Sequence, residues 1–540
     1  MYKKDYENPD THLFYCEKTD WYEEDESGNR SWDMDKVDEF WVCIRQDKMA
    51  HGDYDFTEMI FPQFPEKTFW EEVWDETVPF DHAKRPLFNG LADFREARFL
   101  GSVNFGVVHF AGIADFKNSK FEDSVNIRSA WFKGATYFND CFFAKDTAFF
   151  DSRFFASAEF FHATFTGEST FRACRFNQLA AFSSAQFRNK ADFSSITCSA
   201  KSFFGSTRFE RKVDFNEAEF AEISFHGAEM MSDADFSKIK FSQKVNFDEA
   251  RFQRKADFTK SDFQEARFVD AVFLGKTLFK EAIFNDRIVF QDTVFTSAQW
   301  NKVIFNDEAF PAFLSASFSS SDPSLFQEVE IRCPRLLFSN VIFYDTVQFQ
   351  RCDLQKVEFT ACDIDKVNFS NCLFRKYKNR LILNNDNDKD YTDLSNTYRQ
   401  LKKNRMDAKD WINAGDAYRS EMVMTRRLIW YEFLGSPIMK FHLFINWFIR
   451  CFYEFFSGYH QSLTRPIFWL IFTILSFAAI TTNDWSAFDL ALRDSLNASL
   501  PIVGKIEKDS EHFYWLVAER ILSVIFLAFF VLATRTRLRQ

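Results

Sequence analysis

Phenylalanine recurs along residues 94–295 at steps that alternate, with two irregularities, between five and six residues. The pattern has 38 positions, and 35 of them are Phe. An α-helix repeats every 3.6 residues and a strand every two, so neither element alone explains this spacing. Four consecutive positions lie in the stretch QKVNFDEARFQRKADFTKSDF, at Phe247, Phe252, Phe258 and Phe263.

Each position of the pattern is preceded, two residues earlier, by Ala, Ser, Thr, Cys, Val or Ile. Residues two apart in an extended segment point to the same side, so each small residue and its Phe form an inward-facing pair. Four such sides close a coil of about 22 residues around a Phe-filled axis, and coils stack through backbone hydrogen bonds. We interpret the five-residue step as a plain side. The six-residue step then has one extra corner residue, as at Arg254–Lys255.

The repeat resembles that of the pentapeptide-repeat family, and the resemblance covers residues 88–375. It implies a mainly β fold, a right-handed quadrilateral β-helix, in which the lattice Phe are core side chains. Residues 311–335 interrupt the pattern, as either a protruding loop or a distorted coil. Because a solenoid has exposed sheet edges at its ends, we expect residues 1–87 to cap the first coil, where YDFTEMIFPQF begins the repeat.

Residues 376–460 lose the repeat and are rich in helix formers. Apolar residues at mixed i, i+3 and i+4 spacing predict two amphipathic helices of a linker, over about 392–407 and 409–433. The next segment, 438–456, is aromatic but is broken by charged residues, so it is a poor membrane span. We expect it to lie as a helix at the membrane interface.

Residues 461–540 hold two apolar runs, which predict transmembrane helices over about 466–482 and 517–535. Two buried core helices are the alternative. Basic residues favour the cytoplasmic side of a membrane, and they flank the outer ends of both runs. We therefore expect both termini and the β-helix to be cytosolic, on the inner membrane of a bacterium. The flanking residues are Arg465, Arg535, Arg537 and Arg539.

Between the two apolar runs, residues 487–505 predict an amphipathic helix followed by a turn, which is the plan of a re-entrant pore loop. An external loop with a surface helix is the alternative. The C-terminal region also resembles the two-span, ion-channel-like module of some bacterial pentapeptide-repeat proteins. The T-V-G-Y-G filter is absent, so the resemblance implies no potassium selectivity. The candidate pore-loop residues are Ser495, Asn497, Ser499, Pro501 and Gly504.

The chain has a net charge of −12, and its acidity lies at the N-terminus, where residues 1–90 carry 23 Asp and Glu against 10 Lys and Arg. The repeat region is close to neutral. A protein that mimics DNA needs a strongly acidic rod, and the repeat region is not acidic enough for that. It also has no stripe of basic residues that would predict nucleic-acid binding. The acidic stretch 20–40 is a solvated surface or a docking site for a basic protein partner. The β-helix faces are a second candidate surface for a protein partner.

No motif of catalysis or of cofactor binding is found among the 540 residues, so we predict neither an enzyme nor a cofactor. Ten Cys without a C-x-x-C pair fit a reducing compartment, and the N-terminus lacks the apolar region of a signal peptide. One set of His and Cys residues near the N-terminus has the side-chain types of a metal site, but such a set more often consists of residues that bind no metal together. That candidate metal set is His12, Cys16, Cys43 and His51.

These patterns predict a membrane-tethered protein that acts as an oligomeric channel or pore, with a cytosolic β-helix as sensor or scaffold. Two spans cannot enclose a pore alone, so this hypothesis requires a homo-oligomer in the lipid bilayer. The alternative is a membrane-anchored scaffold that presents the β-helix to protein partners and conducts nothing.

Overall fold

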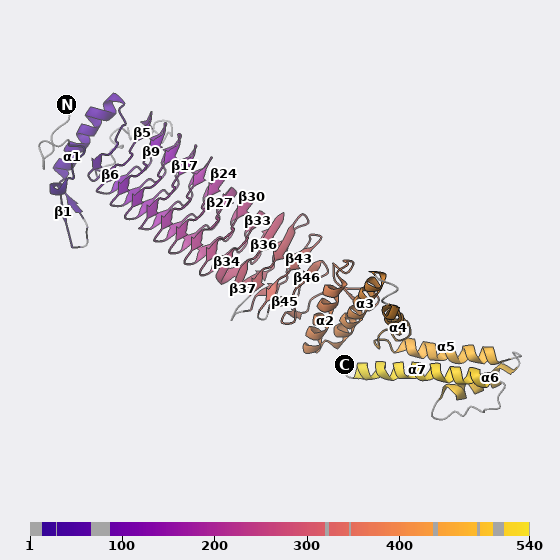
Figure 1. Ribbon diagram of the computed structural model, residues 1–540. Helices are drawn as coiled ribbons and strands as arrows, with labels where there is room; N and C mark the ends of the chain where they lie inside the picture. The colour runs from indigo at the N-terminus through magenta and orange to yellow at the C-terminus, as the bar shows by residue number, and fades with distance from the viewer. Residues whose placement is uncertain are drawn as a thin grey trace, which may run out of the picture. The chain divides into compact units, whose positions relative to one another are not determined.

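A computed structural model gives the three-dimensional structure of the chain, which divides into two compact units (Figure 1). The first unit contains Met1–Glu358 and Lys366–Leu373, and the second contains Phe359–Asp365 and Phe374–Gln540. The structure describes residues 13–26, 28, 30–65, 87–318, 323–344, 347–435, 441–482, 487–500 and 512–538.

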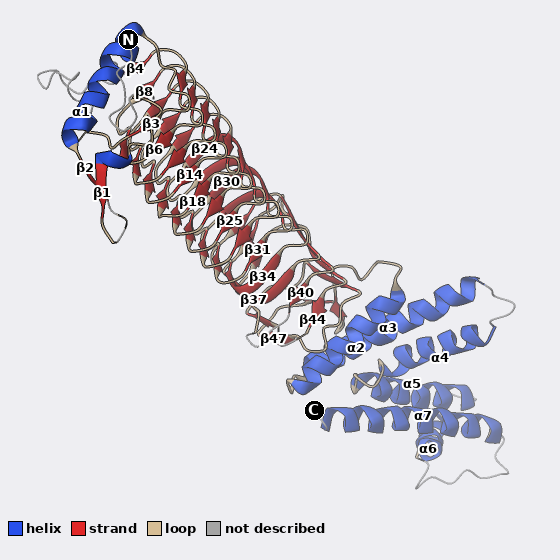
Figure 2. Cartoon of the chain, turned by 60° about the vertical axis from the view of Figure 1, so that its left-hand side comes forward, coloured by secondary structure: helices blue, strands red, loops and turns tan. Residues whose placement is uncertain are grey.

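The first unit is a β-solenoid of about 12 turns, built from short parallel strands that stack coil upon coil (Figure 2). Each strand pairs with the equivalent strand of the next coil, 22 residues later in the regular part; Lys120, for example, lies opposite Phe142. One coil contains β10 (Lys120–Phe121), β11 (Val125–Asn126), β12 (Trp131–Phe132) and β13 (Thr136–Tyr137).

Later coils lose some of their corners and form longer strands. Each of these strands replaces two short ones and runs nearly straight from one Phe position to the next. This happens in six-residue steps and in five-residue steps that have no left-handed residue. The longer strands are β24 (Thr197–Phe203), β27 (Glu219–Ser224), β30 (Lys240–Asn246), β33 (Asp262–Arg267), β34 (Val272–Leu278) and β37 (Val294–Asn301).

The tight corners of the solenoid lie in the five-residue steps. At the first of them the Ala97 N–H donates to the Phe94 carbonyl (3.1 Å), while Glu96 has a φ of 59°. This is the geometry of a type II turn, whose third residue is left-handed. The interpretation of the five-residue step as a plain side was therefore wrong, because a left-handed residue turns the chain within five residues and needs no extra one.

An Asp or Asn directly before the Phe prepares these corners. The Asp257 carboxylate accepts from the Thr259 N–H (3.0 Å), and the Asn246 side chain does the same with the N–H of Asp248 (2.7 Å). Such local bonds satisfy a backbone donor that the turn would leave free. They give the recurring A-D-F and V-N-F triplets a physical cause.

Phenylalanine rings fill the axis of the solenoid in columns along its length. Phe247 is fully buried and stacks on Phe268 of the next coil, with centroids 5.0 Å apart and planes 8° apart. Phe252, Phe258 and Phe263 are equally buried, and each stacks on the Phe of the following coil at 4.6–5.0 Å. The residues two positions earlier are small because they stand at the same inner wall.

The interruption at 311–335 is a lengthened coil. Trp300 lies opposite Phe326, so equivalent positions are 26 residues apart in this coil. The strand β39 (Phe310–Leu314) still pairs in parallel with its neighbours on both sides. The distorted coil predicted as one of two alternatives is therefore present, while residues 319–322 lie outside the described part of the chain.

The N-terminal part of this unit begins with β1 (Tyr22–Glu24) and β2 (Arg30–Trp32), an antiparallel pair, followed by α1 (Met34–Cys43). β3 (Ile60–Phe61) pairs in parallel with β6 (Arg98–Phe99) of the first coil. The Phe61 ring stacks on Phe99 at 4.7 Å, so the chain covers the first sheet edge with a strand of its own.

The second unit is helical. Its segment 359–365 directs backbone donors at α2: the Asp393 carboxylate accepts from Ala361 N–H (2.9 Å) and the Gln400 amide oxygen from Ile364 N–H (2.7 Å). These bonds satisfy backbone donors of the segment 359–365 within the second unit. The helices are α2 (Tyr391–Asp407), α3 (Trp411–Gly435), α4 (Phe441–Ser457), α5 (Thr464–Thr481), α6 (Phe488–Ser499) and α7 (Phe513–Leu538).

Candidate functional site

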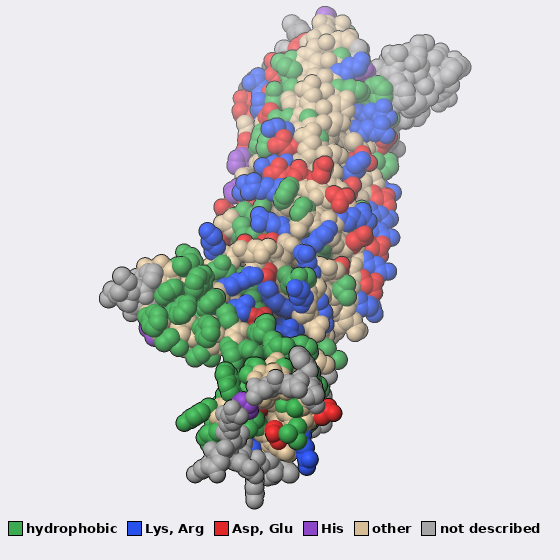
Figure 3. Space-filling view, turned by 90° about the vertical axis from the view of Figure 1, so that its right-hand side faces the viewer, with side chains coloured by type: hydrophobic (Ala, Val, Ile, Leu, Met, Phe, Trp, Pro, Cys, Tyr) green, Lys and Arg blue, Asp and Glu red, His purple; other side chains and the backbone are tan. Residues whose placement is uncertain are grey.

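Two helices of the second unit are long and apolar enough to cross a membrane. They cover Thr464–Thr481 and Phe513–Thr536, whose apolar 18-residue windows have mean hydropathies of 1.5 and 2.3. Only 17% and 28% of these windows are buried, whereas a core helix of a soluble domain is mostly buried. Figure 3 shows hydrophobic side chains gathered over the C-terminal helices. These helices are compatible with membrane anchoring.

A buried carboxylate lies between α6 and α7. Glu519 of α7 is completely buried, and its two carboxylate oxygens accept hydrogen bonds from Ser495 and Ser499 of α6, at 2.9 Å each. Ser523, one turn further along α7, is within 3.0 Å of the Ser499 hydroxyl. Because burying a polar group is costly unless it is hydrogen-bonded, these two serines stabilise Glu519 between the helices.

The next residue, Arg520, fixes the end of α6. Its Nε donates to the Ala498 carbonyl (2.9 Å) and its Nη2 to the Asn497 carbonyl (3.3 Å). The last carbonyls of a helix lack partners within the helix and carry partial negative charge, which suits a guanidinium. Glu519 and Arg520 together therefore tie α6 to the start of α7 through both side chains and backbone.

The predicted pore-loop residues are placed differently from one another. Ser495 and Ser499 meet at Glu519, whereas the Asn497 side chain is exposed. Pro501 and Gly504 lie outside the described residues. Glu519 was not among the predicted site residues, although a charged residue within an apolar run is itself a signal of a functional position.

Helix α4 has one apolar face against α5 and α7 and another that is exposed. The Tyr453 ring contacts Phe529 of α7 with centroids 5.5 Å apart, and Phe456 contacts Phe526 at 5.3 Å. Its Glu454 pairs with Arg426 of α3. The exposed apolar side chains include Phe441, Ile445, Phe448 and Ile449, and such a face on an amphipathic helix is suited to a membrane interface.

The candidate metal set is not assembled among the residues that can be placed. Cys16 is buried and donates to the Leu13 carbonyl, with the Lys18 ammonium 3.5 Å from its sulfur. His51 is exposed, and His12 lies outside the described part of the chain. Within the described ranges no group of three or more His, Cys, Asp or Glu is placed to hold a metal ion.

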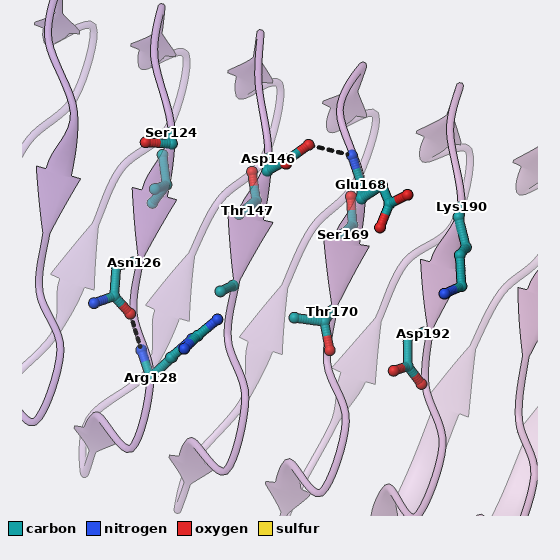
Figure 4. Close-up of a pocket in the computed structure, with 12 residues that line it drawn as sticks. Ser124, Asn126, Arg128, Asp146, Thr147, Glu168, Ser169, Thr170, Lys190 and Asp192 are labelled. Carbon is teal, nitrogen blue, oxygen red and sulfur yellow. Dashed lines mark hydrogen bonds between the residues drawn. The ribbon is translucent and has the colours of Figure 1, made fainter.

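The solenoid wall has a shallow polar hollow of about 420 Å³ over β11, β15 (Thr147–Ala148), β19 (Ser169–Thr170) and β23 (Ala191–Asp192). Figure 4 shows polar side chains of successive coils side by side along it, with the Asp146 carboxylate accepting from the Glu168 N–H (2.8 Å). Both signs of charge line the hollow, so it selects no single ligand charge. The charged lining residues are Arg128, Asp146, Glu168, Lys190 and Asp192.

The fold therefore defines a β-solenoid repeat protein with an appended helical unit. Residues 236–276 match the family model described as pentapeptide repeats (9 copies), and the same repeat extends through the solenoid on both sides of this match. Residues 236–276 are therefore similar to pentapeptide repeats.

Among solved structures, the chain is similar to HetL, a pentapeptide repeat protein involved in heterocyst differentiation regulation from the cyanobacterium Nostoc sp. strain PCC 7120. The identity is 10% and the TM-score 0.18, over 45% of this chain and 83% of HetL. No curated protein matches the chain.

Proposed function

We propose that this β-solenoid protein is anchored in a membrane and that its C-terminal helices assemble, in several copies, into a conduit. The solenoid then serves as a cytosolic sensor or scaffold. The observation that carries the proposal is Glu519, a fully buried carboxylate held by Ser495 and Ser499 between an apolar helix and a short amphipathic one.

An ionisable side chain within a membrane helix is costly and is characteristic of ion and proton pathways. Glu519 lies near the start of α7, where α6 also packs, and in the proposed conduit this end of the two helices would form an entrance. A short helix that returns between two spans is the arrangement predicted for residues 487–505, and α6 occupies Phe488–Ser499 of that segment.

A conduit needs more than one copy of the chain, because α5 and α7 cannot enclose a pore. Both helices leave large apolar side chains uncovered, and in a membrane these would contact lipid or the helices of other copies. The exposed side chains include Phe468, Ile471, Phe472, Ile521 and Val531. This supports a homo-oligomer within the bilayer.

The orientation follows from charge. Arg465 precedes the first span and Arg535 follows the second, and basic residues favour the cytoplasmic side. The solenoid and both termini are then cytosolic, and in a bacterium the membrane is the inner one.

The test uses the full-length protein purified in detergent and reconstituted in liposomes. We expect a mass measurement to show an oligomer and a dye-release or ion-flux assay to show conduction that Glu519→Gln reduces at least several-fold. The matched control is Asp489→Asn, since Asp489 is an exposed carboxylate on α6. A stable monomer without flux would refute the conduit.

The second candidate is an anchored scaffold without conduction, and the polar hollow on the solenoid wall favours it. That hollow spans four coils and presents side chains of both charges, as a surface for a protein partner does. A monomer that shows no flux but retains partner binding when Glu519 is replaced would establish the scaffold.

A further inference from the structure

A pocket of about 330 Å³ lies where the loop between α4 and α5 meets α2, α3 and the end of α7. Its apolar wall is formed by Met406, Trp411 and Tyr418, and Lys402 and Thr536 also line it. The loop contributes Tyr459 and His460, so residues from four parts of the second unit converge on one cavity.

The loop that closes this pocket has an unusual backbone. Gly458, Tyr459 and His460 have φ angles of 56°, 55° and 64°, which makes three successive left-handed residues. For a residue with a Cβ this conformation costs about 1–2 kcal/mol, so two non-glycine residues in a row are held there by their surroundings. Strain of this kind concentrates at functional sites.

Two polar groups of the loop have no partner among the described residues. The Tyr459 side chain is completely buried, yet its hydroxyl makes no hydrogen bond, and Nδ1 of His460 is also buried without one. A buried hydroxyl without a partner costs about 1–3 kcal/mol, which a bound ligand would recover.

Two positively charged side chains lie beside the loop. A Cβ at Gly458 would lie 3.5 Å from Nη1 of Arg465 and 3.6 Å from Nη2 of Arg419, so both guanidinium groups converge on this backbone. Neither forms an ion pair with a carboxylate in the described structure; each donates to a backbone carbonyl instead, and Nε of Arg419 is buried without a partner.

The acidic residues nearby are already paired with other cations. Asp416 pairs with Lys376, and Glu454 pairs with Arg426. Burial and the positive charge of Arg465 lower the pKa of Arg419 from its ordinary value, and they outweigh the opposing effect of the Asp416 carboxylate.

We propose that this pocket, together with the Arg419 and Arg465 guanidinium groups, binds the phosphate-bearing headgroup of an anionic phospholipid. The phosphate lies against the two guanidinium groups, the Tyr459 hydroxyl donates to a headgroup oxygen, and the Trp411 and Tyr418 side of the pocket takes the apolar part. Guanidinium groups bind phosphate strongly because their paired N–H donors match its oxygens.

The source of the phosphate follows from position, and it rests on the proposed membrane anchoring. The pocket lies at Thr536, near the end of the second apolar helix, and directly before Arg465, at the start of the first. Both positions are at the cytoplasmic surface of the membrane in the proposed orientation, where anionic lipids attract basic residues.

The test measures binding to the full-length protein in a neutral detergent. Three probes are titrated: dioctanoyl phosphatidylglycerol, dioctanoyl phosphatidylcholine and inorganic phosphate, with native mass spectrometry and thermal shift as readouts. We expect phosphatidylglycerol to bind at least ten-fold more tightly than phosphatidylcholine, and phosphate alone to bind weakly. Equal binding of inorganic phosphate would overturn a lipid ligand in favour of a soluble phosphate, and no binding of any probe would overturn the site.

Two variants and two matched controls locate the site. Arg465→Gln should weaken phosphatidylglycerol binding about ten-fold, which corresponds to about 1.4 kcal/mol. Tyr459→Phe should weaken it about three-fold without loss of folding, because the hydroxyl has no partner to lose. Arg493→Gln and Tyr514→Phe, at exposed positions of α6 and α7, should change it less than two-fold. Equal effects in variants and controls would overturn the assignment. The readout needs no conduction, so it is independent of the conduit.

Discussion

Phe142 and Phe143 are neighbours in β14 (Phe142–Phe143), yet the first exposes 39% of its surface and the second none. The Phe143 ring stacks on Phe165 of the next coil at 4.6 Å, whereas Phe142 points out of the solenoid wall. Strand geometry puts adjacent side chains on opposite faces, so one residue position decides whether a ring belongs to the core.

The pair gives a direct test of the core. We expect Phe143→Ala to lower the free energy of unfolding by about 3–5 kcal/mol, because it leaves a cavity in the ring column. Phe142→Ala should change it by about 0.5 kcal/mol or less, as a surface substitution does. Urea unfolding followed by circular dichroism measures both, and similar losses would contradict the stacked core.

The corner geometry is tested by two glycines. Gly227 has a φ of +63°, whereas Gly205 does not lie in the left-handed region. A Cβ added at Gly227 would lie 3.6 Å from its nearest atom and one added at Gly205 would lie 3.5 Å away, and both are ordinary contact distances. Gly227→Ala should cost about 1 kcal/mol through the left-handed conformation alone. Gly205→Ala should leave the free energy of unfolding unchanged or raise it by about 0.4–1 kcal/mol, because alanine reduces the conformational freedom of the unfolded chain. Thermal unfolding compares them, and equal effects would show that φ is not the cause.

The solenoid was predictable because its repeat is read from one residue type at a fixed spacing. Phe56 and Phe61 even marked the strand that covers the first coil. The corners were misinterpreted because the left-handed positions hold ordinary residues, such as Glu96 and Lys260, rather than glycine. Their N–H groups bond to the neighbouring coil, and that compensation is not visible in the sequence.

The candidate site was less predictable. Ser495 and Ser499 were singled out as part of a pore loop, but their partner Glu519 is 20 or more residues away and is brought near only by the packing of α6 on α7. The pocket at Tyr459 depends on contacts among α2, α3 and α7, and a local pattern carries no information about such contacts.

The half-buried carboxylate of Asp257 should make stability depend on pH. Burial alone would raise its pKa, but hydrogen bonds from Thr259 and Lys255 outweigh burial and lower the pKa from its ordinary value. Because the pKa is lower in the folded chain, the carboxylate stabilises the fold at pH values above its pKa in the unfolded chain, about 3.9. This stabilisation is lost as the pH falls through the pKa of the folded chain.

Asp257→Asn tests this, since Asn keeps the turn bond, as Asn246 does. The variant should be slightly less stable than the native chain at pH 7 and equally stable near pH 2. Melting temperatures at both pH values measure the difference. A gap that persists unchanged at low pH would mean that the charge has no role.

Eight of the ten cysteines are buried, and Cys372 and Cys451 are partly exposed. Burial raises the pKa of Cys198 to about 12 and that of Cys141 well above its ordinary value. Because the thiolate is the reactive form, we expect maleimide at pH 7 to modify only Cys372 and Cys451 in the native protein and all ten after denaturation. Mass spectrometry counts the adducts, and native labelling of Cys141 would contradict the closed solenoid.

The attachment of α6 to α7 is tested by removing its hydrogen bonds. Ser495→Ala with Ser499→Ala deprives Glu519 of both hydroxyl donors, and a buried acceptor without a partner costs about 1–3 kcal/mol. The double variant should therefore unfold at a lower temperature in detergent, while Ser476→Ala, on α5, should not.

Adding Glu519→Leu to the double variant should restore much of the loss, because replacing both sides of a buried polar contact by apolar groups removes the unsatisfied atom. Thermal unfolding of the full-length protein, with limited proteolysis between α6 and α7 as a local readout, measures the recovery. A triple variant no more stable than the double one would show that the serines act by packing and that Glu519 does not depend on them.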